Sequence, residues 1–145
     1  MAGYRGGPVV KVDEKGRVTV PSKFAAALKE SVAGQMVVAK SPDGCLSLYP
    51  LPVWEQFEAD MRAWPFEMDG WRRLYIGSAT DVELDGSSRV NIPPELRKWA
   101  GLEREVKFMG VGAYFELWDH ARYDEREAQM LAGLRPETLQ KAVIR

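Results

Sequence analysis

Residues 12–21 read VDEKGRVTVP, and residues 84–93 repeat their frame as LDGSSRVNIP. The aspartate, arginine and proline of the second stretch each lie 72 residues after their counterparts in the first. The likeness resumes downstream, where CLSLY at residues 45–49 corresponds to YFELW at residues 114–118. An internal repeat decides how the whole chain is interpreted. Because there are only two short copies, the sequence predicts a pseudo-dimer and not a solenoid.

Composition narrows the class of protein. A chain of 145 residues with 46% hydrophobic and 28% charged residues can form one domain, or two small ones that share a core. The net charge of −1 does not indicate a nucleic-acid binder, so that function requires local clustering of charge. A single cysteine, Cys45, excludes an internal disulfide framework and suits a reducing compartment. No signal peptide or long apolar run is present, so we expect a cytoplasmic protein without a membrane segment.

Each copy begins with two short alternating segments that are typical of half-buried strands. In the first copy these are residues 9–12 and 17–20, and the connection between them contains Gly16, which suits a positive φ, and Asp13, which can bond the turn amides. The pattern therefore predicts a β-hairpin. By the same reasoning strands are expected at 36–39, 46–49, 81–84, 89–92, 106–111 and 114–118.

Helical spacing follows each pair of strands. Ser22 is expected to cap a helix that ends near Gly34, and a second helix carries Trp54 to Trp64. A further helical pattern after Pro65 leads into the second copy. There, helices are expected at 94–100 and from Asp119 to Leu131, and the short tail after Pro136 is expected to be loosely held.

An enzyme is not expected, because the catalytic parts are missing. The single histidine, His120, is interpreted as a surface or capping residue, and no Cys/His cluster has the spacing of metal ligands. The chain also lacks a phosphate-binding glycine-rich loop and a nucleophile elbow. Asp13 and Asp85 are interpreted as ordering their own turns and not as a carboxylate pair. We therefore expect no cofactor and no metal.

Basic residues are concentrated in the first copy. Residues 1–30 hold six basic and three acidic side chains, whereas residues 81–110 hold five basic and six acidic ones. Alternation places Lys11, Asp13, Arg17 and Thr19 on one strand face, with valines 10, 12, 18 and 20 on the other. That polar face either contacts a DNA backbone or major groove, or is an ordinary solvated face closed by an Asp13–Arg17 pair.

The motif in residues 13–18 with Val20-Pro21 resembles the swapped-hairpin signature of AbrB/SpoVT-type DNA-binding domains. A wider set of segments is similar to the MraZ family, in which two such domains lie in one chain. These segments are Arg5-Gly6, AGQMV at 33–37, CLSLYPLPVW at 45–54 and FELWD at 115–119. The resemblance extends from about Tyr4 to Met130.

The resemblance implies an α+β fold, mainly β with helices: a pseudo-dimeric double-split (swapped-hairpin) β-barrel of two tandem AbrB/SpoVT-like repeats. It places the first repeat at residues 4–65, a linker helix at 66–80, the second repeat at 81–131 and a C-terminal tail at 132–145. It further implies a nucleoid-associated transcription factor that forms a ring of identical chains. Such a regulator binds short direct repeats in double-stranded DNA upstream of its own division and cell-wall operon, usually as a repressor.

The family's DNA-contacting arginine corresponds to Arg17 and, through the duplication, to Arg89. The second motif departs from the pattern, because Ser87-Ser88 replaces Lys15-Gly16, and Gly86 is then expected to supply any positive φ. Arg89 either touches DNA or pairs structurally with Asp85. The residues expected to bind DNA are Arg17, Lys15, Lys11, Arg5, Lys23 and Arg89, and those expected to order the turns are Asp13, Gly16 and Asp85.

Two alternatives stay open beside this interpretation: an antitoxin-like module with a protein partner, and a structural protein that only forms rings. A ring of identical chains requires contacts between protomers. The aromatic candidates for those contacts, each of which also suits the core, are Trp54, Phe57, Trp64, Trp71 and Trp118.

Overall fold

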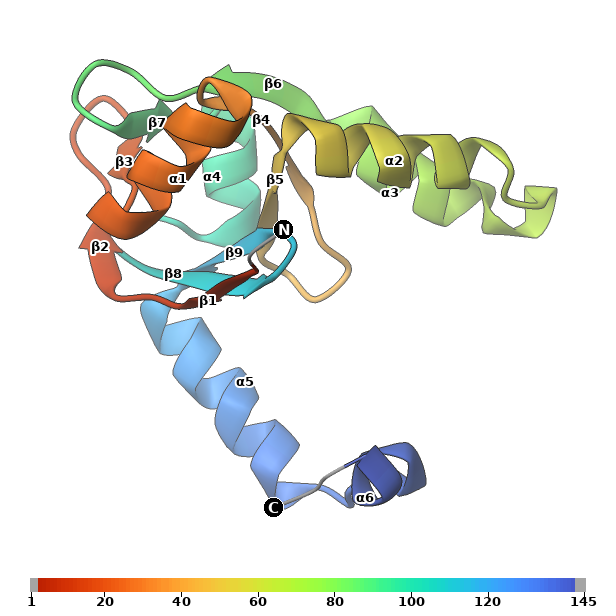
Figure 1. Cartoon of the computed structure of the whole chain (residues 1–145). Coiled ribbons are helices and arrows are strands. Elements are labelled where there is room, and N and C mark those ends of the chain that lie inside the picture. Colours follow the sequence, from red (N-terminus) through yellow and green to blue (C-terminus); the bar gives the residue numbers. More distant parts are fainter. Residues whose placement is uncertain (1–2, 143–145) are drawn as a thin grey trace.

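The computed structural model describes residues 3–142 and shows both copies folded around one barrel (Figure 1). The first copy comprises β1 (Tyr4–Gly6), β2 (Val9–Lys11), β3 (Arg17–Thr19), α1 (Ser22–Val32), β4 (Gln35–Lys40), β5 (Leu46–Pro50) and α2 (Leu51–Arg62). A connection of η1 (Phe66–Met68) and α3 (Asp69–Ser78) follows. The second copy comprises β6 (Thr80–Glu83), β7 (Arg89–Asn91), α4 (Pro94–Ala100), β8 (Glu105–Gly112), β9 (Phe115–Asp119) and α5 (His120–Ala132), and α6 (Glu137–Ala142) ends the described chain.

The copies exchange strands. One sheet has the order β1-β8-β9-β5-β4-β6, with β2 also paired to β8, and a second sheet consists of β3 and β7 alone. Thus β2 of the first copy pairs with β8 of the second, and β6 of the second pairs with β4 of the first. All these pairings are antiparallel. Neither copy completes its sheet without the other.

The local hairpins expected at residues 9–20 and 81–92 are therefore wrong. Strands β2 and β3 are joined only by an isolated bridge between Val12 and Val18, beyond which they diverge to different partners. Alternation identifies a strand, but it does not identify the strand's partner, because that depends on contacts distant in sequence. The double-split barrel implied by the resemblance is confirmed.

An internal twofold axis relates the copies. Strands β3 and β7 pair so that Val18 lies opposite Val90, and these two residues correspond to each other in the repeat. Strands β5 and β9 pair with Ser47 opposite Glu116, again two residues that correspond in the repeat. Both symmetric pairings lie on the axis, so the molecule has the architecture of a dimer within one chain.

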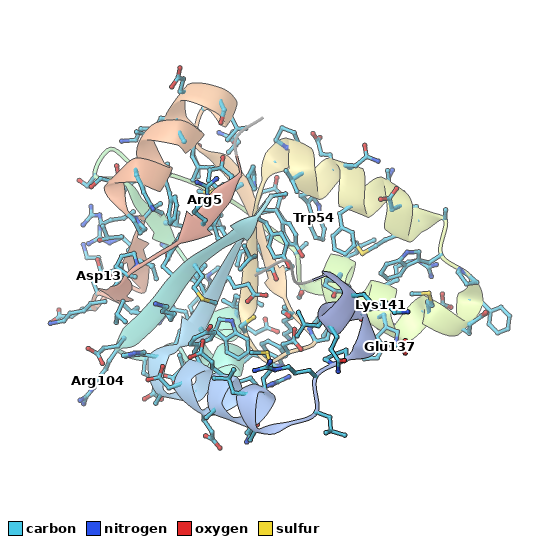
Figure 2. The ribbon with its side chains drawn as sticks, turned by 60° about the horizontal axis from the view of Figure 1, so that its bottom comes forward. Arg5, Asp13, Trp54, Arg104, Glu137 and Lys141 are labelled. Carbon is cyan, nitrogen blue, oxygen red and sulfur yellow. The ribbon has the colours of Figure 1, made fainter. Side chains whose placement is uncertain are left out.

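One detail at the start of a helix differs from expectation. Helix α1 begins at Ser22 itself, after Pro21, and has no side-chain cap. In the tail that is expected to be loosely held, residues 137–142 form α6, in which Glu137 and Lys141 pair at 3.0 Å (Figure 2). The side chains of α6 are exposed, and residues 143–145 of the expected tail lie outside the described part of the chain.

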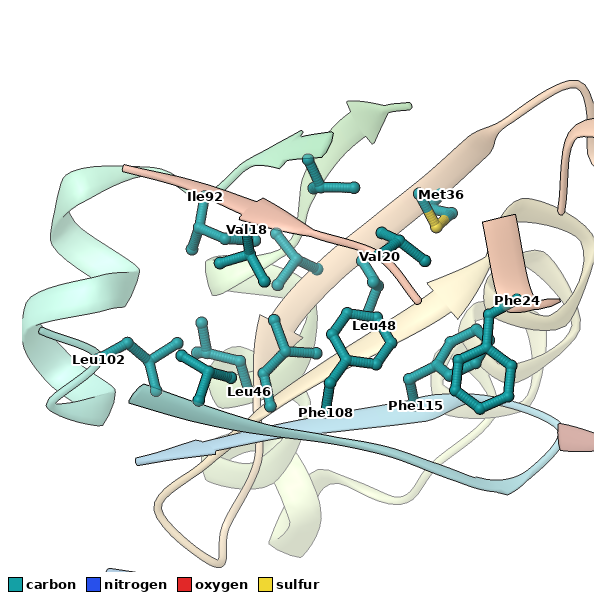
Figure 3. Packing of buried hydrophobic residues seen from close by; sticks show 14 of the residues in the cluster. Val18, Val20, Phe24, Met36, Leu46, Leu48, Ile92, Leu102, Phe108 and Phe115 are labelled. Atoms are coloured by element: carbon teal, nitrogen blue, oxygen red, sulfur yellow. The ribbon is translucent and has the colours of Figure 1, made fainter. Parts of the chain in front are cut away.

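One hydrophobic core joins the copies (Figure 3). Val18 and Val20 of the first copy and Ile92 of the second are at most 1% exposed, and they enclose the core together with Phe108 and Phe115. The inward face expected for the valines is confirmed at these positions. A smaller cluster lies under α2 and α3, where residues of β4, β5 and α2 are buried: Val37, Ala39, Tyr49, Trp54 and Met61. Of the five aromatic candidates, Trp54 and Trp118 are buried, whereas Trp71 is 52% exposed.

Candidate nucleic-acid interface

The pairing of β3 with β7 brings the two repeated turns together. Arg17 lies opposite Asn91, and Arg89 lies opposite Thr19. The backbone locks each turn to the other copy as well, because Val20 N donates to Ser88 O at 2.9 Å and Ile92 N donates to Gly16 O at 3.1 Å. These two bonds are equivalent under the internal twofold, so both turns lie beside the axis.

Asp13 organises the first turn. Its Oδ1 accepts hydrogen bonds from the backbone amides of Lys15 and Arg17, both at 2.9 Å. Its Oδ2 accepts from Arg17 Nε at 2.7 Å. Gly16 adopts a φ of 80°, in the left-handed region that glycine enters at low cost. The turn is thus fixed from inside by one carboxylate, and the Arg17 side chain is fixed with it.

The second turn has the same geometry despite its different sequence. Asp85 Oδ1 accepts from the amides of Ser87 at 2.8 Å and Arg89 at 2.9 Å, and its Oδ2 accepts from Arg89 Nε at 3.1 Å. The positive φ expected at Gly86 is wrong, because Ser88 itself adopts a φ of 60°. The Ser88 hydroxyl accepts from Lys29 Nζ at 2.7 Å. The aspartate bonds set the turn shape, so the residue at the Gly16 position takes the left-handed conformation even when it is serine.

Hydrogen bonding shifts the titration of both aspartates. The backbone amide of Arg17 holds the pKa of Asp13 below its ordinary value of 3.8, and the amide of Arg89 lowers the pKa of Asp85 in the same way. Both carboxylates are therefore ionised at neutral pH. Each turn carries a fixed anion whose charge an arginine of the same turn balances.

The two arginines use only one side of the guanidinium for this contact. The Nη1 and Nη2 atoms of Arg17 form no hydrogen bond to any residue between 3 and 142, and its side chain is 26% exposed. Arg89 is similar, with a side chain 31% exposed and its Nη1 4.0 Å from Asp13 Oδ2 in the other copy. Arg17 can therefore pair with Asp13 through Nε and still offer its Nη1 and Nη2 donors to another partner.

Two further cations lie at the turns, and each comes from a helix of the opposite copy. Lys29 of α1 contacts the second turn through Ser88. Arg97 of α4 donates from Nε to Ile92 O at 2.9 Å and packs on the first turn, where a Cβ added to Gly16 would lie 2.4 Å from its Cζ. Sequence reasoning missed both as site residues, because only the exchange of strands brings these helices to the turns.

The remaining predicted residues fall at separate places. Lys15 is exposed at the tip of the first turn, and Lys11 is exposed on β2, opposite Glu105. Lys23 Nζ donates to Arg5 O at 3.3 Å, and these two residues line a groove of about 680 Å³ between β1, α1 and α2. Figure 2 shows Arg5 away from Asp13 and Arg104. The structure thus brings Lys15, Arg17 and Arg89 together on the turns and groups Arg5 with Lys23.

Other kinds of site have little support in the described part of the chain. Residues 3–142 hold no group of three or more His, Cys, Asp or Glu side chains able to bind a metal ion. Burial raises the pKa of the Cys45 thiol to about 12, so this thiol is a poor nucleophile. His120 lies at the start of α5, between Glu105 at 3.7 Å and Asp124 at 3.4 Å. No helix within residues 3–142 has the length and apolar character needed to cross a membrane.

Comparison with known proteins identifies the family. The sequence profile described as "MraZ protein, putative antitoxin-like" matches this chain twice, over residues 4–74 and 75–139. The protein named Transcriptional regulator MraZ from Burkholderia cenocepacia (strain HI2424) is 43% identical over 136 residues, covering 94% of this chain and 96% of that protein. Its namesakes from Burkholderia mallei (strain SAVP1) and Burkholderia pseudomallei (strain 668) are 44% identical with the same coverage. Two matched repeats and relatives of nearly equal length lead to one conclusion: the chain belongs to the MraZ family.

Proposed function

We propose that this chain is a transcriptional regulator that binds double-stranded DNA through its two paired turns. The observation that carries the proposal is the pair of aspartate-anchored arginines, Arg17 and Arg89, on neighbouring turns. The names of the Burkholderia relatives support the regulatory role. An arginine held through Nε has lost much of its rotamer freedom before it meets DNA, so less entropy is lost on binding.

Arg17 is the residue proposed to read bases. Its Nη1 and Nη2 donors match the O6 and N7 acceptors of guanine in the major groove, a contact worth roughly 1–3 kcal/mol of discrimination. Lys15 beside it and Lys11 on β2 are proposed to contact phosphates, as are Arg5 and Lys23, which lie together away from the turns. Arg89 is proposed to contact phosphate or to read bases more weakly, since its turn lacks the lysine.

One chain offers few base contacts, so we propose that the regulator acts as a ring of identical chains. Neighbouring protomers would engage direct repeats spaced about one helical turn, ~10 bp, on the same face of the duplex. Every contact after the first becomes effectively intramolecular, which raises avidity on the order of 100-fold or more. The proposed target is the DNA upstream of the protein's own division and cell-wall operon, with repression as the outcome and the nucleoid as the location.

A titration of the upstream DNA with wild-type protein and Arg17→Ala tests the proposal. At moderate salt we expect Arg17→Ala to weaken binding by about 10- to 100-fold, and Arg89→Ala to weaken it less. Lys15→Ala is expected to weaken binding to all sequences and to reduce the slope of log affinity against log salt by about one. Arg62→Ala is the matched control, because that side chain is 73% exposed and pairs with Glu58 on its own helix.

Circular dichroism and sizing on the same samples separate loss of contact from loss of fold or assembly. Equal binding by wild type and a folded, assembled Arg17→Ala would show that Arg17 is a turn residue and that the interface lies elsewhere. If the wild type binds neither the upstream DNA nor unrelated DNA at any salt concentration, the proposed function is wrong, and a protein partner becomes the object of search.

A further inference from the structure

The cations that reach the two turns from opposite helices do not correspond in the repeat. Arg97 of α4 contacts the first turn, and its counterpart 72 residues earlier is the buried Ala25 of α1. The second turn therefore has no equivalent guanidinium. Lys29 lies four residues after Ala25, on the same face of α1, and its Nζ donates to Ser88 Oγ at 2.7 Å. A lysine one helical turn further along thus takes the place of the missing arginine.

The residue at the tip of each turn matches the cation that contacts it. Gly16 and Ser88 both adopt the left-handed conformation, with φ of 80° and 60°. A Cβ at Gly16 would lie 2.4 Å from Arg97 Cζ, so the first turn has no room for a side chain there. Ser88 can carry one because the equivalent helix position holds Ala25. Its hydroxyl is then the acceptor that Lys29 uses.

Lys29 keeps most of its binding capacity in this contact. An ammonium group has three N–H donors, and the hydrogen bond to Ser88 uses one of them. The serine hydroxyl is neutral, so the positive charge is not balanced by it. No carboxylate within residues 3–142 forms an ion pair with Lys29, and the residue is exposed. The second turn therefore presents a tethered, unbalanced cation next to Arg89.

This cation restores a charge that the second turn lacks in its own sequence. Lys15 of the first turn corresponds to Ser87 of the second. The backbone amides of these two residues donate to the aspartates of their own turns at 2.9 Å and 2.8 Å, so the two residues occupy equivalent places. The second turn thus loses one lysine from its sequence and gains another, Lys29, from the opposite copy.

We propose that Lys29 is a DNA-contacting residue, which binds a backbone phosphate beside the second turn. It performs there the role proposed for Lys15 at the first turn. The ammonium acts on phosphate as a point charge, and neutralisation of the phosphate releases its counterion. The contact therefore adds affinity without reading sequence. The inference rests on the proposed function and gives the second turn a part in DNA binding.

Titration of the full chain with two duplexes, the upstream DNA and one of unrelated sequence, tests the assignment over a range of salt concentrations. We expect Lys29→Ala to weaken binding to both duplexes by roughly 3- to 10-fold at low salt. The slope of log affinity against log salt should fall by about one for each bound chain. Lys141→Ala is the matched control, because Lys141 is 75% exposed, pairs with Glu137 and lies on α6, apart from the barrel in Figure 1.

Two variants of the second turn separate contact with DNA from a role in holding the turn. Ser87→Lys places a lysine where the first turn has Lys15, so in the Lys29→Ala background it should restore both the affinity and the salt slope. Ser88→Ala removes the acceptor but leaves the charge of Lys29, so the salt slope should stay that of the wild type. A tether alone predicts neither result.

An unchanged salt slope in a folded Lys29→Ala would overturn the inference, as would failure of Ser87→Lys to rescue it. Equal losses of affinity in Ser88→Ala and Lys29→Ala, both with the wild-type slope, would show that Lys29 only holds the turn. Arg17→Ala keeps this outcome distinct from that of the proposed function. If binding depends on Arg17 but not on Lys29, the proposed function stands and this contact is wrong. If the wild type binds neither duplex, both are wrong.

Discussion

Replacement of Val90 by alanine is expected to destabilise both copies to the same extent. Val90 is 1% exposed and lies opposite Val18 where β3 meets β7. The substitution removes two buried methyl groups, worth about 0.8 kcal/mol each. The cavity that remains adds roughly 1 kcal/mol, because the surroundings relax only in part. We therefore expect the free energy of unfolding to fall by about 2–3 kcal/mol, which lowers Tm by roughly 5–10 °C for a chain of this size.

Hydrogen–deuterium exchange distinguishes a shared core from two separate ones. The slowest amides of β4, in the first copy, and of β8, in the second, should lose the same protection in Val90→Ala, and denaturation followed by circular dichroism should show one transition. Val9→Ala is the matched control, because Val9 is 37% exposed and its loss should change stability by no more than about 0.5 kcal/mol. Loss of protection confined to β8, or two separate transitions, would refute the argument that the copies share one core.

Three further outcomes are expected at single residues. The pKa of Asp13 is lowered in the folded state, so the stability that the ionised carboxylate supplies is fully present above the ordinary pKa of 3.8 and disappears as the pH falls through the folded pKa. The difference in free energy of unfolding between wild type and Asp13→Asn, measured by urea titration, should therefore shrink over that pH range. Gly16→Ala should cost about 1–2 kcal/mol from its positive φ alone, plus a clash with Arg97 that a second substitution, Arg97→Ala, relieves. Cys45, buried and with its pKa raised to about 12, should react with iodoacetamide at pH 8 only as fast as the chain opens, which mass spectrometry under increasing urea can follow.

Most of the fold could be predicted because the sequence contains a duplication. Its constant spacing of 72 residues identified counterparts such as Val18 and Val90, and a pseudo-dimer places such counterparts across an axis. The short alternating segments were recognisable as strands because their valines face the core. Their partners were not recognisable from the residues alone, because a two-residue period has no information about which strand lies alongside. For that reason the local pattern suggested hairpins where the chain exchanges strands.

The site was predictable only where it is local. Asp13 and Arg17 are four residues apart, so a turn that joins them can be inferred from the sequence, and the equivalent turn at Asp85 follows from the repeat. Lys29 and Arg97 reach the turns from helices of the opposite copy, and no sequence spacing indicates that contact. The left-handed conformation of Ser88 also escaped prediction, because residue preference favours glycine, whereas three bonds to Asp85 impose the turn shape.

The two turns share a geometry but differ in charge, and this difference bears on the kind of DNA site that the chain would suit. A twofold-symmetric dimer matches a palindrome because its halves are interchangeable. Here the internal twofold exchanges Lys15 with Ser87, and it exchanges residues 9–38, with five basic and three acidic side chains, for residues 81–107, with five basic and six acidic ones. Rotation about the axis superposes the backbones of the two copies but not their charges. A DNA site that fits this surface is therefore not palindromic and has a defined orientation. Chains arranged head to tail preserve that direction from one protomer to the next. The altered second turn therefore favours direct repeats over inverted ones as the proposed target.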